Sequence, residues 1–138
     1  MIILDTNVLS EFTKPVTDPQ VFAWLDAQPR GELAVTAVTK AEMLGGAMIL
    51  DDGARRRRLI ELIGAALAPF EGAMLAFDSE AAAQFAALTA KRRSAGRPIG
   101  IMDAQIDAIA LARGAIIATR DTDDFSGVGV ELIDPWTA

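Results

Sequence analysis

The sequence predicts an α/β protein whose parallel sheet is covered by helices on both faces. Short apolar runs alternate along the chain with segments of helical periodicity, which is the pattern of parallel strands joined by crossover helices. The first run, Ile2-Ile3-Leu4, is apolar throughout, as expected for a strand buried on both faces. The 138 residues contain no repeat, low-complexity tract or linker, so we expect one domain spanning residues 1–138.

The expected strands are short apolar segments between helices. In chain order they are residues 2–4, 33–35, 74–77 and 115–119, followed by an edge strand at 130–133. The first ends directly at a carboxylate, Asp5, and the fourth ends at Arg120 and Asp121. Two acids are therefore expected at the carboxyl ends of strands.

The expected helices have recognisable ends. Asp18 is expected to cap the first helix, and Thr39 with Glu42 has the spacing of a capping box at the start of a helix that runs to about Leu50. The later helices are expected from Arg55 to Leu67 before Pro69, from a cap at Asp78 or Ser79 to about Ala95, and from near Met102 to Arg113 before Gly114.

Two groups of residues are expected to pack closely. Gly45 and Gly46 interrupt the second helix, where each costs about 1 kcal/mol relative to alanine. We therefore expect close packing there, within the chain or at a dimer or partner contact. The residues expected in the core are Phe22, Trp24, Phe85 and Leu88, and Trp136 is expected to pack the chain end.

The composition excludes several classes of site. The chain has no cysteine and no histidine, so it cannot form a disulfide, a Ser-His-Asp triad or a zinc site of the usual kind. Its start lacks a basic, apolar leader, and no apolar run of about 18 residues could span a membrane. We expect a protein of the cytoplasm without membrane contact, whose chemistry uses carboxylates, hydroxyls, amides, lysine or arginine.

The net charge of −6 argues at first against a nucleic-acid partner. The distribution of charge matters more than its sum. One basic block comprises residues 55–58, and a second comprises Lys91, Arg92, Arg93 and Arg97. Taken alone, each block is more often a solvated helix face. A cluster of acids that binds cations accounts for part of the negative sum.

Four acids are expected to meet at one edge of the sheet. Asp5 and Asp121 follow strands, and ligands of open α/β sheets bind outside the carboxyl ends of the strands. Glu42 and Asp103 lie near the starts of helices, which begin at the same edge when they follow parallel strands. Asp107 is four residues beyond Asp103 and shares its helix face, so it is a candidate to support this group.

Such a cluster of like charges needs compensation. Carboxylates in one pocket repel one another, and one of them takes up a proton unless a cation is bound. Oxygen ligands select hard cations, above all Mg²⁺, with Mn²⁺ as a substitute. A cation held in this way can polarise a phosphoryl group and activate water. The predicted chemistry is therefore metal-dependent hydrolysis of a phosphate ester.

Each acid alone has an ordinary explanation. An Asp directly after a strand, as Asp5 is, most often serves only as a helix cap. Glu42 could serve only as the partner of Thr39 in the capping box. Asp103 could be only a favourable charge at a helix N-terminus, and Asp121 only a turn residue. The four explanations are improbable together because all four positions fall at one edge of one sheet.

Four motifs resemble those of PIN-domain nucleases, in particular toxins of the VapC and FitB type. In chain order they are Leu4-Asp5-Thr6-Asn7-Val8-Leu9-Ser10-Glu11, Thr39-Lys40-Ala41-Glu42-Met43-Leu44-Gly45-Gly46, Met102-Asp103-Ala104-Gln105-Ile106 and Thr119-Arg120-Asp121-Thr122-Asp123-Asp124-Phe125. The tail Ile133-Asp134-Pro135-Trp136 is also similar. The likeness spans the chain, and the four motifs are specific only in combination.

The resemblance implies a three-layer α/β/α sandwich and a magnesium-dependent endoribonuclease. The positions that match the catalytic quartet are Asp5, Glu42, Asp103 and Asp121, with Asp5 and Asp103 as direct metal ligands. Thr6, Asn7 and Thr119 match polar positions that orient the site, and Asp124 competes with Asp121 for the last place in the quartet. The implied partners are an RNA substrate, a second copy in a homodimer, and a small antitoxin protein in a heterotetramer or larger complex.

Three alternatives were weighed against the nuclease. A phosphatase of the haloacid-dehalogenase type needs a second Asp two residues after the first, where this chain has Asn7. A receiver domain needs an Asp after a middle strand, but residues 33–35 are followed by Thr36. The remaining alternative is a catalytically weak PIN-fold module that acts with an antitoxin in DNA-bound autoregulation. The sequence leaves open the RNA target, the number of metal ions and the antitoxin.

Overall fold

A computed structural model describes residues 1–29 and 31–138 of the chain. Its centre is a parallel sheet with the strand order β2-β1-β3-β4. The strands are β1 (Ile2–Leu4), β2 (Leu33–Ala34), β3 (Ile116–Ala118) and β4 (Leu132–Ile133). In the register, Ile3 lies opposite Ala34 on one side and Ile117 on the other. The expected parallel α/β sheet is confirmed, and β1 lies at its centre.

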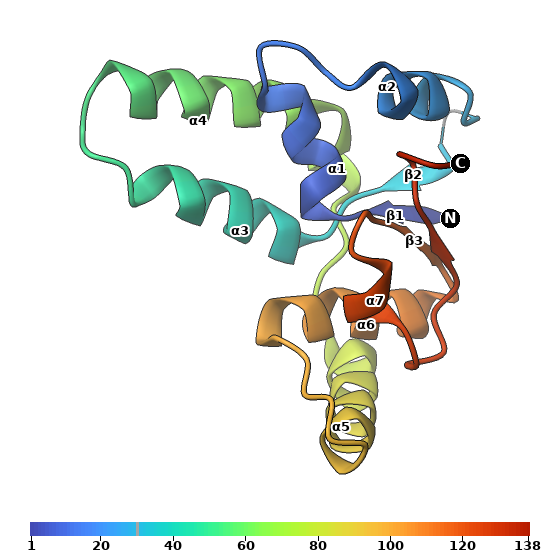
Figure 1. Cartoon of the computed structure of the whole chain (residues 1–138). Coiled ribbons are helices and arrows are strands. Elements are labelled where there is room, and N and C mark those ends of the chain that lie inside the picture. The colour runs from blue at the N-terminus through green and yellow to red at the C-terminus, as the bar shows by residue number, and fades with distance from the viewer. Residues whose placement is uncertain (30) are drawn as a thin grey trace.

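Helices connect the strands and cover both faces of the sheet (Figure 1). They are α1 (Thr6–Ser10), η1 (Glu11–Thr13), α2 (Pro19–Asp26), α3 (Ala37–Met48), α4 (Ala54–Leu67), η2 (Ala68–Ala73), α5 (Ser79–Ser94), α6 (Ile101–Arg113) and α7 (Thr122–Phe125). In Figure 1, α3 and α4 form a hairpin that projects away from the sheet. Within the described ranges, no helix has both the length and the apolarity needed to cross a membrane.

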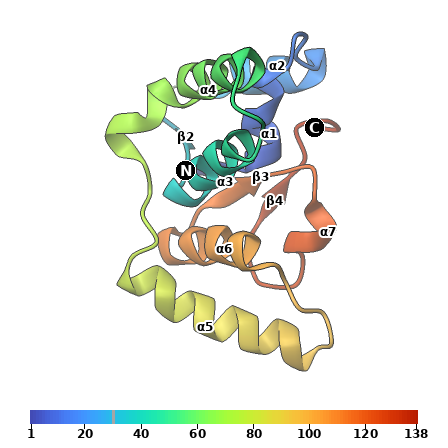
Figure 2. The same ribbon diagram turned by 90° about the vertical axis from the view of Figure 1, so that its left-hand side faces the viewer.

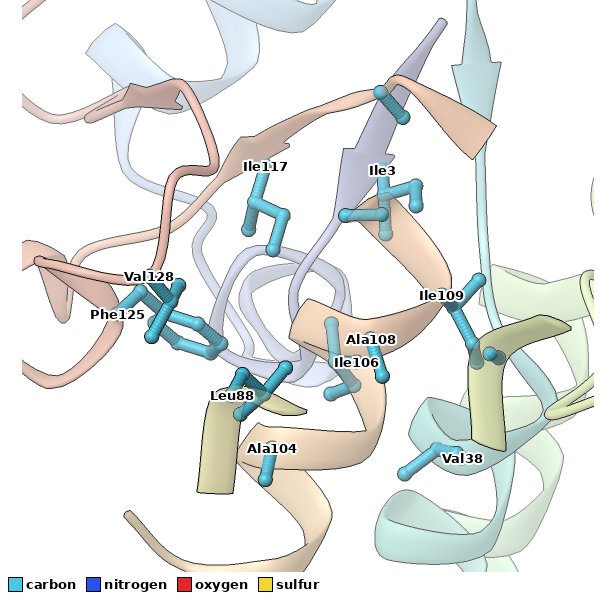
Figure 3. Packing of buried hydrophobic residues seen from close by; sticks show 13 residues of the cluster. Ile3, Val38, Leu88, Ala104, Ile106, Ala108, Ile109, Ile117, Phe125 and Val128 are labelled. Atoms are coloured by element: carbon cyan, nitrogen blue, oxygen red, sulfur yellow. The ribbon is translucent and has the colours of Figure 1, made fainter. Parts of the chain in front are cut away.

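An apolar core lies on each face of the sheet, between the sheet and the helices that cover it, and this gives the fold its three layers. Ile2 and Leu4 point to one face and pack with residues of α1, α2 and α4, whereas Ile3 points to the other face. Figure 3 shows Ile3 and Ile117 facing Ile106 and Ile109 of α6. In Figure 2, α6 lies between the sheet and α5. Successive residues of a strand point to opposite faces, so the apolar run of β1 supplies both cores.

Helix ends confirm most of the expected caps and correct one. The side chains of Asp18 and Asp78 accept hydrogen bonds from the first turns of α2 and α5, and α6 ends at Gly114 in the left-handed conformation. The expected capping box is wrong. Thr36 is the N-cap of α3 and its hydroxyl accepts from the Thr39 amide, so Glu42 lies too far along the helix to take part.

The segment expected as a third strand, residues 74–77, does not join the sheet as a strand. It forms one isolated parallel bridge, in which the Leu75 amide donates to Val35 O at 2.9 Å and the Ala37 amide donates to Leu75 O at 2.8 Å. Phe77 is exposed, and Asp78 then caps α5. The extended segment is too short for a longer ladder because the helix cap follows it at once.

Two packing expectations are also wrong within the described chain. A methyl group built on Gly45 or Gly46 would meet nothing within 4 Å, so these glycines do not mark a close approach between elements of this chain. Phe22 is 55% exposed, whereas Leu88 is buried as expected. Trp24 and Phe85 are partly buried against the cores. The pattern predicted the helices but not which of their faces meets the sheet.

Arg92 belongs to the interior and not to a solvated basic face. It is 6% exposed, and its guanidinium donates to the carbonyl oxygens of Arg97, Asp124 and Ser126 at 2.6–2.9 Å. These bonds join the end of α5 to the segment that contains α7. Only part of the second basic block is therefore available to a nucleic acid.

We predict that Arg92→Met lowers the free energy of unfolding by about 2–4 kcal/mol, because buried carbonyl oxygens lose a charged donor. Urea unfolding measures the loss. Arg93→Met is the matched control, since Arg93 is exposed on the same helix and its loss is expected to change stability by less than about 0.5 kcal/mol. Equal losses in the two variants would contradict the structural role of Arg92.

Candidate functional site

Asp5 lies at the carboxyl end of β1, where the chain turns into α1. Its own amide donates to Ala118 O, which fixes it to the end of β3. One carboxylate oxygen accepts from the Thr6 amide at 2.7 Å, and the other accepts from the Thr119 hydroxyl at 2.8 Å. The residue is 4% exposed. Asp5 is therefore both the N-cap of α1 and a buried acid held by two neighbouring strand ends.

Glu42 faces Asp5 from α3. The Thr6 hydroxyl donates to Glu42 Oε1 at 2.9 Å, and the buried Thr39 hydroxyl lies 3.4 Å from that of Thr6. In Figure 1 the starts of α1 and α3 lie next to the end of β1. The polar face that α3 turns to the sheet edge thus holds Glu42 beside the first motif.

Asp103 is the third residue of α6, after Gly100, which provides no side-chain cap. Its side chain is half-buried and accepts no hydrogen bond within the part of the chain that the structure describes. Ordinary capping therefore does not explain this acid. The charge of Asp103 acts on Asp5, so the two carboxyl groups are close enough to interact, and the place where these acids meet is called the acidic pocket.

The fourth motif supplies polar groups from the loop between β3 and α7. The Asn7 side-chain amide donates to Asp121 at 3.1 Å and to the Thr119 hydroxyl at 3.2 Å. Asp121 makes no side-chain cap bond to α7, so its carboxylate is held by Asn7 instead. Asp124 is exposed one turn later. The structure brings both acids to the pocket, Asp121 beside Asn7 and Asp124 near Asp103.

Burial and neighbouring acids raise the pKa values of Asp5 and Asp103. Burial raises the pKa of Asp5 to about 6, against the lowering effect of its bonds to Thr119 and Thr6, and the charges of Asp103 and Glu42 raise it further. Burial also raises the pKa of Asp103. The charges that add to this rise are, in order of size, those of Glu42, Asp124 and Asp121. A cation at this place would relieve the repulsion.

Asp107 is the residue whose environment the sequence did not reveal. It is fully buried at 0% exposure, and neither carboxylate oxygen has a hydrogen-bond partner among the described residues. Burial raises its pKa to about 8, the charge of Asp103 raises it further, Arg92 lowers it and Asp5 raises it. The four-residue spacing from Asp103 is visible in the sequence, but burial without a partner is not.

One of these acids, Glu42, lines an open groove between α1, α3 and α4. It measures about 310 Å³, and its lining includes Thr6 and Glu42 at one end and Leu59 and Ile63 further along α4. Among the described residues, no three acids already enclose a space for a metal ion. The arrangement suits a hydrated ion held by one or two carboxylates, as Mg²⁺ usually is.

Fold and acidic pocket together define a class of protein, and comparison with known proteins identifies it. The PIN domain model matches residues 2–131. VapC ribonuclease Y4jK of Sinorhizobium fredii is 41% identical over 138 residues, covering 99% of this chain and 98% of that protein. Toxin FitB of Neisseria gonorrhoeae is 35% identical, with 99% of each chain covered. The chain belongs to the PIN-domain family.

A solved structure shows the same fold. The structure of FitAB bound to an IR36 DNA fragment contains a chain that is 36% identical, with a TM-score of 0.88 and coverage of 99% of this chain and 96% of that one. The expected three-layer α/β architecture of the PIN type is therefore confirmed.

The raised pKa of Asp5 predicts a pH-dependent stability in metal-free buffer. Because the folded protein holds the Asp5 proton more tightly than the unfolded chain, whose pKa is 3.8, this group stabilises the fold at low pH. That contribution is lost as pH rises from about 4 to about 6. Asp5→Asn removes this loss, so at pH 7 the free energy of unfolding of the variant should be higher than that of the wild type by up to about 3 kcal/mol.

Urea unfolding with EDTA at pH 4 and pH 7 measures this difference. The two proteins should be nearly equally stable at pH 4, where Asp5 is protonated in the folded state. Asp26→Asn is the control, because Asp26 is exposed and lies outside the pocket. A stabilisation by Asp5→Asn that is the same at both pH values would show that Asp5 does not titrate in this range.

Proposed function

We propose that this protein is a magnesium-dependent endoribonuclease and the toxin of a toxin–antitoxin pair. The observation that carries the proposal is the convergence of carboxylates at the carboxyl edge of the sheet, where the charges of Glu42 and Asp103 act on the buried Asp5 and the charge of Glu42 acts on Asp103. The family relationship supports it, since the relative from Sinorhizobium fredii is named a ribonuclease. The whole chain, residues 1–138, acts as one PIN domain in this proposal.

The residues present fit a divalent cation. Asp5 and Asp103 are the proposed direct ligands, and Asp103 has no competing hydrogen bond among the described residues. The donors are carboxylate oxygens without histidine or cysteine, which favours Mg²⁺ and accepts Mn²⁺. When bound, such an ion polarises the phosphoryl group and lowers the pKa of the attacking water.

The other residues of the pocket position these groups. Thr119 donates to Asp5 and, through its oxygen, accepts from the Asn7 amide and the Asp121 amide, so it links the first and fourth motifs. Thr6 fixes Glu42. We propose Glu42 and Asp121 as the acids that orient the water and the phosphate, with Asp124 as a further acid on the Asp103 side.

The groove beside Glu42 is the proposed path of the RNA. It runs along α3 and α4 to Leu59, and Arg55 lies four residues before Leu59 on the same face of α4. Arg56, three residues before Leu59, lies on this face as well, so Arg55 and Arg56 continue the path with positive charge. An anionic backbone can thus be held at one end of the groove while a phosphate enters the acidic pocket.

The partners proposed for this chain are a small antitoxin protein and a second copy of the chain. A separate apolar groove of about 390 Å³ lies between η1, α2 and α4, lined among others by Phe12, Leu25 and Leu62. It suits an apolar segment of the antitoxin. The complex of FitAB with DNA supports an assembly of this kind, with heterotetramers or larger complexes as the expected form.

A catalytically weak module that acts only in DNA-bound autoregulation is the second candidate. The DNA-bound structure of FitAB supports a DNA-linked role, but it does not account for the buried acids around Asp5. Loss of catalysis would leave no reason to keep mutually repelling carboxylates in one pocket. The nuclease is therefore the favoured function, and the two differ in whether the purified protein cleaves RNA.

We predict that the purified protein cleaves structured RNAs in the presence of Mg²⁺, and that EDTA or Asp103→Asn lowers the rate at least 100-fold. The reason is that Asp103 is a proposed direct ligand of the ion. Gel analysis of an RNA panel measures the rate, and Asp26→Asn is the control for loss of one acidic side chain. Cleavage that persists in EDTA or in Asp103→Asn would overturn the metal mechanism, and a folded, metal-binding wild type without cleavage would favour the module.

We predict that Arg55→Gln with Arg56→Gln weakens RNA binding and reduces its salt dependence. Each lost phosphate contact lowers the slope of log K against log salt by about 0.7–0.9. Binding is measured in the Asp103→Asn background by fluorescence anisotropy at several salt concentrations, so that the RNA stays intact. Lys91→Gln with Arg93→Gln removes the same charge from α5 and is the matched control. If both pairs lower the slope equally, residues 55–58 are not a specific path.

A further inference from the structure

Asp107 is a buried acid that the proposed quartet does not use. It lies on α6, one turn beyond Asp103, with 0% exposure. Both of its carboxylate oxygens lack a hydrogen-bond partner within the described ranges. A buried carboxylate without a partner is costly, and native structures rarely keep one without a reason.

The neighbouring cation does not provide that partner. Arg92 is close enough for its charge to act on Asp107. However, its Nε and Nη1 groups donate to the carbonyl oxygens of Arg97, Asp124 and Ser126, and within the described chain no hydrogen bond joins the guanidinium to Asp107. The other charges that act on Asp107 are those of Asp103 and Asp5, which are the two proposed metal ligands.

We propose that Asp107 is an additional carboxylate of the cation site, which supports the ion held by Asp5 and Asp103 by accepting hydrogen bonds from its water shell. This inference rests on the proposed function. The two unpartnered oxygens are acceptors, and the donors that reach this side of the pocket when the site is loaded are the waters that Mg²⁺ retains. A water-mediated role agrees with the absence, among the described residues, of three acids that enclose an ion directly.

Two consequences distinguish this positioning role from a purely structural one. Outer residues of a metal site typically change affinity about 10–100-fold when they are replaced, whereas a structural residue does not change it. In the metal-free protein the same carboxylate is an uncompensated buried group, so its replacement should stabilise the fold. Asp107 is therefore expected to lower the stability of the empty protein and to raise its affinity for the ion.

The experiment measures Mn²⁺ binding to the intact protein by calorimetry and electron paramagnetic resonance, together with the Tm in EDTA. Asp107→Asn keeps the shape of the side chain, and Asp107→Leu removes all polar atoms. We expect both variants to bind Mn²⁺ at least 10-fold more weakly and both to have a higher Tm in EDTA than the wild type. Glu131→Gln is the matched control, because this exposed residue precedes β4 at the opposite edge of the sheet and should bind Mn²⁺ as the wild type does.

An unchanged Mn²⁺ affinity in Asp107→Asn, with a raised Tm and with binding lost in Asp103→Asn, overturns the role of Asp107 and leaves the proposed function intact. A wild type that binds no Mn²⁺ overturns both. If Asp107→Asn fails to fold, Asp107→Leu decides, because it needs no hydrogen-bond partner at the buried position. Equal weakening by Glu131→Gln would assign the effect to net charge and would also overturn the inference.

Discussion

The structure is organised around the repulsion among carboxylates at one edge of the sheet. Burial of Asp5 and its proximity to Asp103 and Glu42 oppose ionisation, yet the fold still places these side chains together. Hydroxyl and amide donors, chiefly Thr119 and the Thr6 amide, offset part of this cost at Asp5. In the proposed function a bound divalent cation offsets the remaining cost, because its positive charge attracts the carboxylates that otherwise repel one another.

The rest of the chain maintains this arrangement. The two cores clamp β1 from both faces through Ile3 on one side and Leu4 on the other, so the end of the strand that carries Asp5 cannot move aside. Arg92 donates to the carbonyl oxygens of Asp124 and Ser126 in the α7 segment, and these bonds keep the acids of the fourth motif near the pocket. Apolar packing and one buried guanidinium therefore hold together groups that electrostatics would separate.

The sequence predicted the sheet, the edge at which the acids meet and most helix caps, because these depend on local patterns such as apolar runs, capping side chains and strand–helix order. It failed where burial or longer-range contacts decide. Residues 74–77 are apolar enough for a strand, but only one bridge forms before Asp78 caps α5. Thr36 rather than Thr39 caps α3, because the position of the cap depends on where the preceding strand ends.

Charged residues were the hardest to place from pattern alone. In the sequence Arg92 belongs to a block of basic residues of which it alone is buried, and the sequence shows Asp107 only as a residue four positions after Asp103. Helix periodicity predicts the direction in which a side chain points but not how deeply other elements bury it. The buried Arg92 and Asp107 lie on α5 and α6, which pack against each other. Asp107 extends the group of acids one helical turn beyond Asp103 into the core, and the charge of Arg92 opposes the rise in its pKa.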